Sequence, residues 1–229
     1  MIQFYYHPSP NPAKVALALE EMGLDYEVVP VDTRKGEQHE AAFREINPNG
    51  KTPAIVDMSV GEGGTRVFDS NAILLYLAEK TGRFMPADRA EALSWLMFVA
   101  TGIGPYSGQA VHFRHIAPRV DQSGSDYGNQ RYQFEARRHW GILNDHLADR
   151  EWMVGDYSIV DMAVWGWAGP VPFIMGDDAW DAFPNVKRLK DAIDARPAAQ
   201  AANALRTRFE FKQESDAETM KAMFPSLAA

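Results

Sequence analysis

The apolar pattern of the chain changes character once, near residue 80. Before that point, short runs of β-branched and aromatic residues, typical of strands, alternate with segments of helical spacing. We predict helices at 12–22, 37–46 and 69–77, and strands at 2–6, 26–31, 54–57 and 66–68. This order, β-α-β-α-β-β-α, indicates an α/β domain over residues 1–80.

After residue 88 the strand-like alternation disappears. Residues 81–88 contain Gly82 and Pro86 between two helical patterns, which predicts an interdomain linker. Apolar residues then recur at helical spacing over 89–101, 130–147, 159–167 and 186–195. We therefore predict an all-helical second domain over 89–229, interrupted by a polar loop at 115–129.

Composition excludes several classes of function. The 229 residues include no cysteine, so disulfides, thiolate metal sites and catalytic protein thiols are absent. The 23 basic and 31 acidic side chains give a net charge of -8, which argues against nucleic acid and anionic membranes as partners. No stretch approaches the roughly 18 apolar residues that span a bilayer, and the first residues do not have the pattern of a secretion signal. We expect a cytoplasmic protein, in which any thiol chemistry uses a sulfur brought by a ligand.

A first candidate site lies between the first predicted strand and helix. Asn11 stands before Pro12, a combination suited to the N-cap and first positions of a helix. The amides and dipole of a helix N-terminus favour an anion, and a thiolate is such an anion. The Ser9 hydroxyl and the Asn11 amide can donate hydrogen bonds to a ligand sulfur and lower its pKa. The alternative is that Asn11 is only a helix cap.

Two more positions suit a ligand that resembles a peptide. A cis bond between Thr52 and Pro53 would turn the Thr52 backbone outward to pair with an extended ligand, but only about 5–6% of X–Pro bonds are cis, so the spacing leaves the isomer open. Asp69 and Ser70 open the third predicted helix. Ser70 and the exposed amides can hold a carboxylate while Asp69 holds an ammonium, or the pair can cap the helix without a ligand.

Two other pairs of polar residues are assigned no ligand-binding role. Ser158 and Asp161 have the spacing of a capping box before an apolar helix, so we assign them a folding role. His112 and His115 would need a third ligand to hold a metal, and we expect no metal site.

Together, these segments resemble the glutathione transferase family. The resemblance covers nearly the whole chain and rests on the motifs NGKTPA (49–54), DSNAILLYL (69–77) and YSIVD (157–161). It implies the glutathione transferase fold, which is a thioredoxin-like N-terminal domain followed by a C-terminal helical domain. It also implies a homodimer, with the substrate pocket formed by the helical domain.

Within that family, SPNPAKV (9–15), GIGP (102–105) and GQAVHF (108–113) resemble the nu class, bacterial disulfide-bond reductases that use bound glutathione. This resemblance implies roles for nine residues: Ser9 and Asn11 at the thiol, Thr52 with Pro53 at the cysteinyl backbone, Asp69 and Ser70 at the γ-glutamyl end, Gln38 and Lys51 near the glycyl carboxylate, and Arg131 near a second glutathione.

The first loop departs from two other patterns of the family. When Pro12 is aligned with the Ser-Xaa-Pro-Cys-Arg pattern of the theta-like classes, Pro10 falls at the position of the catalytic serine. Tyr6 lies near the place where the tyrosine classes keep their thiol-activating hydroxyl. We favour Asn11 and Ser9 for thiol activation and keep Tyr6 in reserve.

The leading hypothesis is therefore a glutathione-dependent disulfide reductase. A bound glutathione thiolate attacks a small disulfide, and a second glutathione resolves the mixed disulfide. Glutathione conjugation or thioether cleavage on an aromatic electrophile is the alternative within the same fold. A non-catalytic binding module is a third reading, because fold does not determine function.

Overall fold

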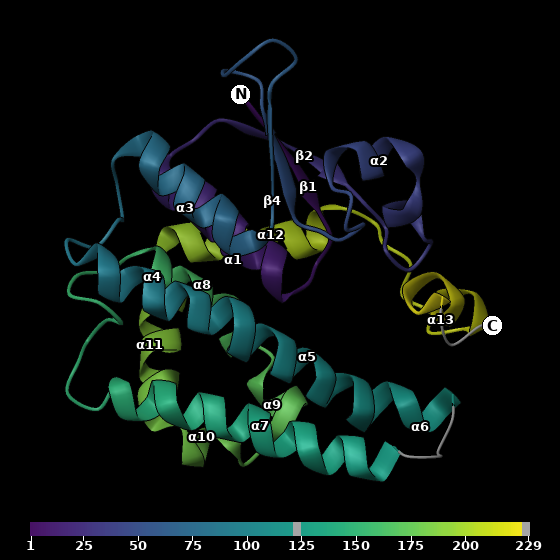
Figure 1. Cartoon of the computed structure of the whole chain (residues 1–229), viewed down its shortest axis with the longest axis vertical. Helices are drawn as coiled ribbons and strands as arrows, with labels where there is room; N and C mark the ends of the chain where they lie inside the picture. Colours follow the sequence, from purple (N-terminus) through teal and green to yellow (C-terminus); the bar gives the residue numbers. More distant parts are fainter. Residues whose placement is uncertain (121–124, 226–229) are drawn as a thin grey trace. The chain divides into compact units, whose positions relative to one another are not determined.

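The computed structural model describes residues 1–120 and 125–225 (Figure 1). The chain forms two compact units, Met1–Thr81 together with Pro197–Ala229, and Gly82–Arg196. The second unit is therefore shorter than the helical domain expected over 89–229. The reason is that α12 (Pro197–Arg208) packs against α1 (Pro10–Met22) of the first unit.

The first unit contains a four-stranded sheet in the order β2-β1-β3-β4. The strands are β1 (Ile2–Tyr6), β2 (Tyr26–Pro30), β3 (Ala54–Asp57) and β4 (Thr65–Phe68). Strand β1 is parallel to β2 and antiparallel to β3, which is in turn antiparallel to β4. The predicted thioredoxin-like arrangement is thus confirmed, with strand ends that differ from the prediction by one residue at most.

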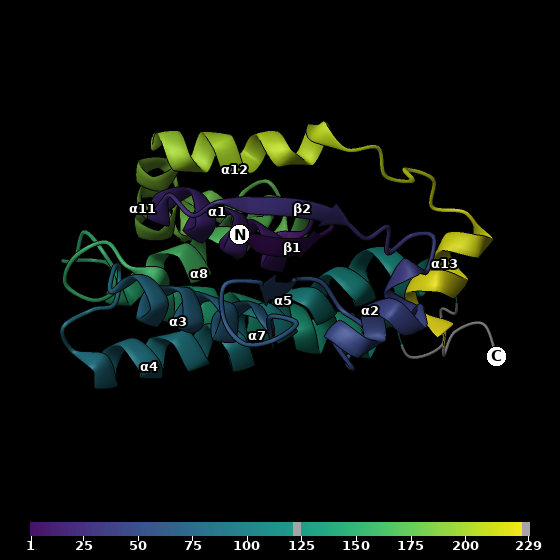
Figure 2. The same ribbon diagram turned by 90° about the horizontal axis from the view of Figure 1, so that it is seen from above.

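The other described elements of this unit are helical. They are α1, the short 3-10 turn η1 (Glu37–His39), α2 (Ala41–Ile46), α3 (Ser70–Thr81), α12 and α13 (Ala217–Met223). Helix α1 lies between α3 and α12 (Figure 2). The burial of each strand follows its sequence: β1 alternates buried and half-buried residues, whereas all four residues of the inner strand β3 are buried.

The described residues of the second unit form an all-helical bundle. Its elements are α4 (Arg89–Phe98), η2 (Val99–Ile103), α5 (Gly104–Val111), η3 (His112–Ile116), α6 (Ala117–Val120), α7 (Ser125–His146), α8 (Ile159–Ala168), α9 (Val171–Met175), α10 (Ala179–Ala182) and α11 (Pro184–Asp194). Every residue of α8 is buried, so this helix forms the centre of the bundle. The predicted capping box at its start is confirmed, with Ser158 and Asp161 as partners.

The predicted loop at 115–129 is wrong for the residues that the structure describes. Residues 112–120 continue as helix, and α7 begins at Ser125, while 121–124 lie outside the described residues. Gly128, which falls within the predicted loop, is a packing residue of α7. A Cβ atom added there would lie 2.3 Å from the Phe113 ring, so glycine is needed for the close approach of that ring.

No helix within residues 1–120 and 125–225 has both the length and the apolar composition needed to cross a membrane.

Candidate functional site

Three of the predicted segments leave the sheet at the same edge. In the sheet register, Tyr5 lies opposite Ala54, and Ala54 lies opposite Phe68. Strand β1 therefore ends where antiparallel β3 begins and where β4 ends. The segments that meet at this edge are residues 7–11, 51–53 and 69–70. The register thus brings together candidate residues that lie as far apart in the sequence as Ser9 and Ser70.

Helix α1 begins earlier than predicted. Ser9 is the N-cap and Pro10 the first helical residue, so the prediction of Asn11 as N-cap is wrong and Asn11 lies inside the first turn. The Ser9 hydroxyl donates to the His7 carbonyl at 3.4 Å and caps no helix amide. Because Pro10 and Pro12 carry no N–H, Asn11 supplies the only backbone donor among the first three helical residues. Donation from this turn therefore depends on Asn11.

Tyr6, the reserve candidate, is part of the core. Its side chain is 2% exposed and packs against Phe4 and Phe211, with ring centroids 5.5 and 6.3 Å away. Burial raises the pKa of Tyr6 to about 12. Because this hydroxyl lies in the core, it is poorly placed to donate a hydrogen bond to a ligand thiol.

The peptide bond between Thr52 and Pro53 is cis, which settles the isomer that the spacing left open. Pro53 is buried and Thr52 half-buried, directly before β3. The turn before them is held by the side chain of Asn47, whose Nδ2 donates to the Lys51 carbonyl at 2.6 Å. Thr52 therefore lies at the shared sheet edge, directly after a turn that the Asn47 side chain holds.

Asp69 caps α3 from an unusual backbone conformation. Its φ angle is 70°, in the left-handed region that Asp tolerates better than most residues. Its Oδ1 accepts hydrogen bonds from the amides of Asn71 and Ala72, at 2.9 and 3.2 Å. Asp69 therefore caps the helix. Because the Asn71 and Ala72 amides already donate to Asp69, a ligand carboxylate at the start of α3 would need a hydrogen bond from the Ser70 hydroxyl.

Lys14 is a residue of this edge that the sequence analysis did not single out. Its side chain is 1% exposed, and Nζ donates to Ser70 Oγ at 3.3 Å and to Asn71 Oδ1 at 3.2 Å. Burial lowers the pKa of Lys14 to about 7, against the opposing effect of the Asp69 charge. One signal was present in the sequence: Lys14 stands four residues before Ala18, on the apolar face of the helix.

Gln38 and Lys51 lie near each other. An added Cβ on Gly50, which has a φ angle of 62°, would stand 3.0 Å from the Gln38 carbonyl oxygen, so the two turns are in contact. Gln38 is only 6% exposed because α13 covers it, and its Nε2 donates to the Ala222 carbonyl at 3.2 Å. Among the described residues, its buried Oε1 has no hydrogen-bond partner.

Comparison with known proteins identifies the family. A model described as "Glutathione S-transferase, N-terminal domain" matches residues 8–80. The chain is 43% identical over 204 residues to the disulfide-bond oxidoreductase YfcG of Escherichia coli (strain K12), with 86% of this chain and 92% of the relative covered. It is 35% identical over 215 residues to the disulfide-bond oxidoreductase YghU of the same organism, with 87% and 73% covered. The chain belongs to the glutathione transferase family.

Solved structures of glutathione transferases share the fold. A glutathione transferase from Pseudomonas putida, crystallised with one glutathione disulfide per subunit, matches with a TM-score of 0.79 and 37% identity, covering 88% of this chain and 90% of that one. A family member from Pseudomonas fluorescens pf-5, crystallised with two glutathione molecules, matches with a TM-score of 0.80 and 38% identity, covering 88% and 91%. The predicted glutathione transferase fold is confirmed.

Of the nine residues predicted for this transferase-family site, eight lie in the first unit. Arg131 lies on α7 of the second unit, where its Nη1 is 3.4 Å from Glu135 Oε1 and its side chain is 50% exposed. It is an accessible cation on a helix that packs against α5.

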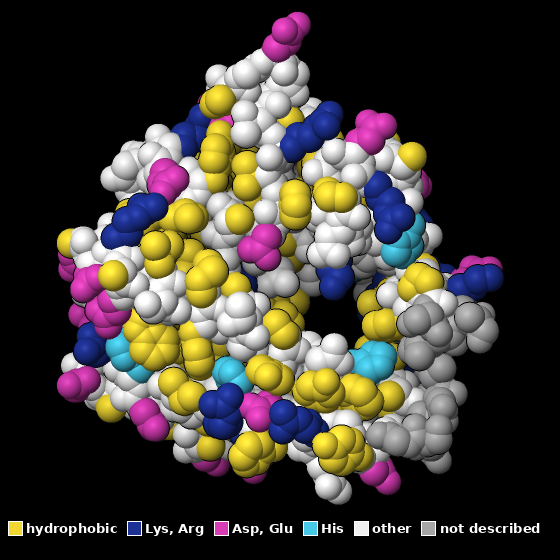
Figure 3. All heavy atoms as spheres, in the orientation of Figure 1, with side chains coloured by type: hydrophobic (Ala, Val, Ile, Leu, Met, Phe, Trp, Pro, Cys, Tyr) yellow, Lys and Arg dark blue, Asp and Glu magenta, His cyan; other side chains and the backbone are white. Residues whose placement is uncertain are grey.

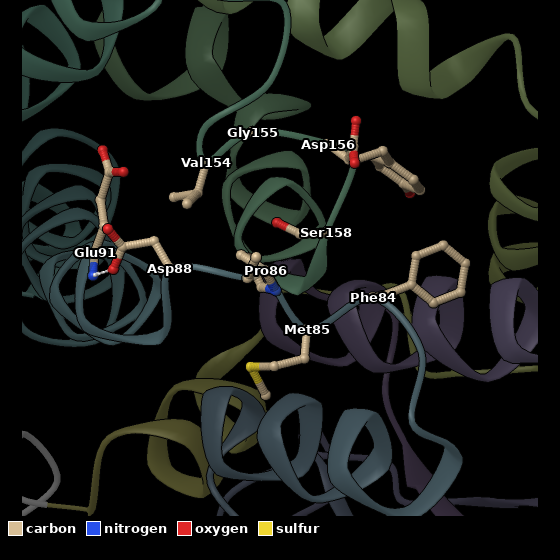
Figure 4. Close-up of a pocket in the computed structure, with 11 residues that line it drawn as sticks. Phe84, Met85, Pro86, Asp88, Glu91, Val154, Gly155, Asp156 and Ser158 are labelled. Atoms are coloured by element: carbon tan, nitrogen blue, oxygen red, sulfur yellow. Dashed lines mark hydrogen bonds between the residues drawn. The ribbon is translucent and has the colours of Figure 1, made fainter.

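The second unit of this family member also contains a pocket of about 530 Å³ between the start of α4 and the loop before α8 (Figure 4). Two of its polar side chains, Asp88 and Ser158, form hydrogen bonds that cap helices. Asp88 accepts from the Glu91 amide at 2.9 Å, and the Ser158 hydroxyl donates to Asp161 at 3.0 Å. None of the nine predicted residues lines this pocket.

On the face shown in Figure 3, basic and acidic side chains are interspersed. Within the described ranges, no group of three or more His, Asp or Glu side chains could hold a metal ion.

Proposed function

We propose that this protein is a glutathione-dependent disulfide-bond reductase that activates the thiol of bound glutathione. The observation that carries the proposal is the sheet register, which brings Asn11, Thr52 and Ser70 to one edge of the first unit. Relatives named disulfide-bond oxidoreductases, and relatives crystallised with glutathione or its disulfide, support the same chemistry.

In the proposed reaction, the thiolate of the first glutathione attacks one sulfur of a small disulfide. A mixed disulfide forms, and the other sulfur leaves as a thiolate that takes up a proton. The thiolate of a second glutathione then attacks the glutathionyl sulfur of the mixed disulfide, forming glutathione disulfide and releasing the second substrate thiol. Two glutathione thiols are oxidised and one substrate disulfide is reduced, so a chain without cysteine can complete the cycle.

Asn11 is the proposed thiol-activating residue. Its side-chain amide is the proposed hydrogen-bond donor to the sulfur, in the first turn of α1, where the helix dipole favours a thiolate. Ser9, as the N-cap residue beside it, is the proposed second contact to the sulfur. The burial of Tyr6 argues against the reserve assignment.

The other parts of glutathione are assigned to residues along the same edge of the sheet. We assign the cysteinyl backbone to Thr52, beside the cis Pro53, and the γ-glutamyl head group to Asp69 and Ser70. The contact between the Gln38 and Gly50 turns supports Gln38 and Lys51 as the pair near the glycyl carboxylate. Arg131 is the proposed contact to the second glutathione.

Counting ligands and comparing substrates test this function together. Native mass spectrometry should show two reduced glutathiones, or one glutathione disulfide, per subunit. Turnover of 2-hydroxyethyl disulfide should exceed turnover of chloro-dinitrobenzene. Faster conjugation than disulfide reduction would favour a conjugating transferase, and binding without turnover would favour a binding module.

We further propose a cytoplasmic homodimer in which residues 1–80 bind glutathione, 81–88 form a linker and the helices of 89–195 supply contacts to the disulfide substrate. The family resemblance supports this assembly. Sedimentation velocity should give twice the chain mass of 25.6 kDa.

A further inference from the structure

We propose that Lys14 is a positioning residue for glutathione, which sets the direction of the Ser70 hydroxyl and places a positive charge behind the γ-glutamyl carboxylate. The inference rests on the proposed function, because it takes Ser70 as the contact to that carboxylate. The inference adds to the site a buried cation that acts through Ser70 and has no direct contact with the ligand.

The first observation is that the Lys14 side chain is buried. A lysine that is 1% exposed is rare, because burying an ammonium group without partners is costly. Here Nζ donates to Ser70 Oγ at 3.3 Å and to Asn71 Oδ1 at 3.2 Å. Both partners belong to the first turn of α3, so the lysine joins the starts of α1 and α3.

The direction of these hydrogen bonds determines what Ser70 offers to a ligand. An ammonium group only donates, so Ser70 Oγ accepts from Lys14 and keeps its own proton for another acceptor. A carboxylate at the start of α3 is such an acceptor. A neutral lysine amine can accept the Ser70 proton instead, which would withdraw the hydroxyl from the ligand.

The charges around Lys14 allow this change near neutral pH. Burial lowers the pKa of Lys14 to about 7, and the Asp69 carboxylate, just before α3, acts in the opposite direction. On α12, which also packs on α1, the basic residues Arg206 and Arg208 act on the tyrosines of β1 and β2. Asp69 is therefore the charged neighbour to which the Lys14 proton responds.

A bound carboxylate would favour the protonated lysine, so binding of the ligand is coupled to uptake of a proton. Affinity should fall as the pH rises through the pKa of the free protein. With a pKa of about 7 before binding, the linkage gives a loss of about tenfold between pH 6 and pH 8.

The test is calorimetric titration of the whole protein with S-methylglutathione, whose sulfur carries no proton. The wild type should lose about tenfold in affinity between pH 6 and pH 8. Lys14→Met removes the cation at similar length, so its affinity at pH 6 should be about tenfold weaker and nearly independent of pH. His7 remains in both proteins, so its titration contributes equally.

A kinetic readout separates positioning from a structural role. Lys14→Met should raise the KM for glutathione and leave kcat for disulfide reduction within about threefold, because the lysine does not face the thiol. If Lys14→Met does not fold, Lys14→Gln, which keeps a hydrogen-bond donor without the charge, should show the same loss of pH dependence.

The outcomes distinguish the two proposals. If the wild type binds no S-methylglutathione, the proposed function fails. If the wild type binds it and the variant that folds has the same affinity and pH profile, the proposed function stands and the role of Lys14 is rejected.

Discussion

Gln38 and Ala222 are joined by a hydrogen bond between the amide Nε2 and the carbonyl oxygen, 3.2 Å apart, although 184 positions separate them in the chain. The same C-terminal segment makes other polar contacts with residues 32–39. The Lys212 amide donates to the buried carboxylate of Asp32 at 2.7 Å, and Arg34 donates to the carbonyl of Gln213. The end of the chain therefore holds the turn that carries a candidate ligand residue.

Deleting residues 212–229 should loosen that turn. The buried Asp32 carboxylate would lose the Lys212 amide, and Gln38 would lose its carbonyl partner. Hydrogen exchange of residues 32–39 should accelerate by about tenfold or more, as expected for loss of about 1.5 kcal/mol of local stability. Strand β3 is the internal reference, and its exchange should stay the same. Unchanged exchange at 32–39 would show that the segment does not hold the turn.

Asn11→Ala should reduce disulfide turnover. A hydrogen bond to a charged group contributes about 1.5–3 kcal/mol, so kcat/KM for 2-hydroxyethyl disulfide should fall by roughly 10- to 100-fold. The matched control is Tyr6→Phe, which removes a buried hydroxyl in the same part of the unit and should keep turnover within about threefold. Full activity in Asn11→Ala would remove Asn11 from the mechanism, and a loss in Tyr6→Phe would restore the tyrosine.

Lys14→Met should change how stability depends on pH. The folded-state pKa of about 7 lies below the usual 10.5, so between these values the unfolded chain binds more protons than the folded one. The free energy of unfolding of the wild type should therefore rise with pH from 7 towards 10, by at most about 1.4 kcal/mol per pH unit. Urea unfolding followed by circular dichroism at pH 7 and pH 9 measures this rise. The variant should lack this contribution, and equal slopes in the two proteins would contradict the prediction.

Ser158→Ala should destabilise the second unit. The Ser158 hydroxyl accepts from the Val160 amide and donates to the buried Asp161 carboxylate. Loss of such an N-cap costs about 1–2 kcal/mol. Ser94→Ala, on the exposed face of α4, should change stability by less than about 0.5 kcal/mol.

Tryptophan fluorescence during urea unfolding can follow the Ser158→Ala effect, because all six tryptophans lie between residues 82 and 196. A Ser158→Ala midpoint equal to that of Ser94→Ala would show that the capping box contributes little.

Local patterns predicted the elements whose signals lie within a few residues. The alternation of β1 and the spacing of Ser158 and Asp161 are of this kind. The start of α1 shows the limit of such signals. Ser9-Pro10 and Asn11-Pro12 both suit an N-cap followed by proline, and the local sequence offers no reason to choose between them.

The sequence by itself determined the order of strands and helices, the absence of protein thiols and the motifs of the family, because these depend on residue type and on short spacing. The tertiary structure alone decided that Lys14 is buried against Ser70, that α12 packs on α1, and that Gln38 is covered by α13. Each of these is a contact between segments far apart in the chain. Such contacts depend on which surfaces remain to be buried once the local elements have formed, and that is a property of the whole fold.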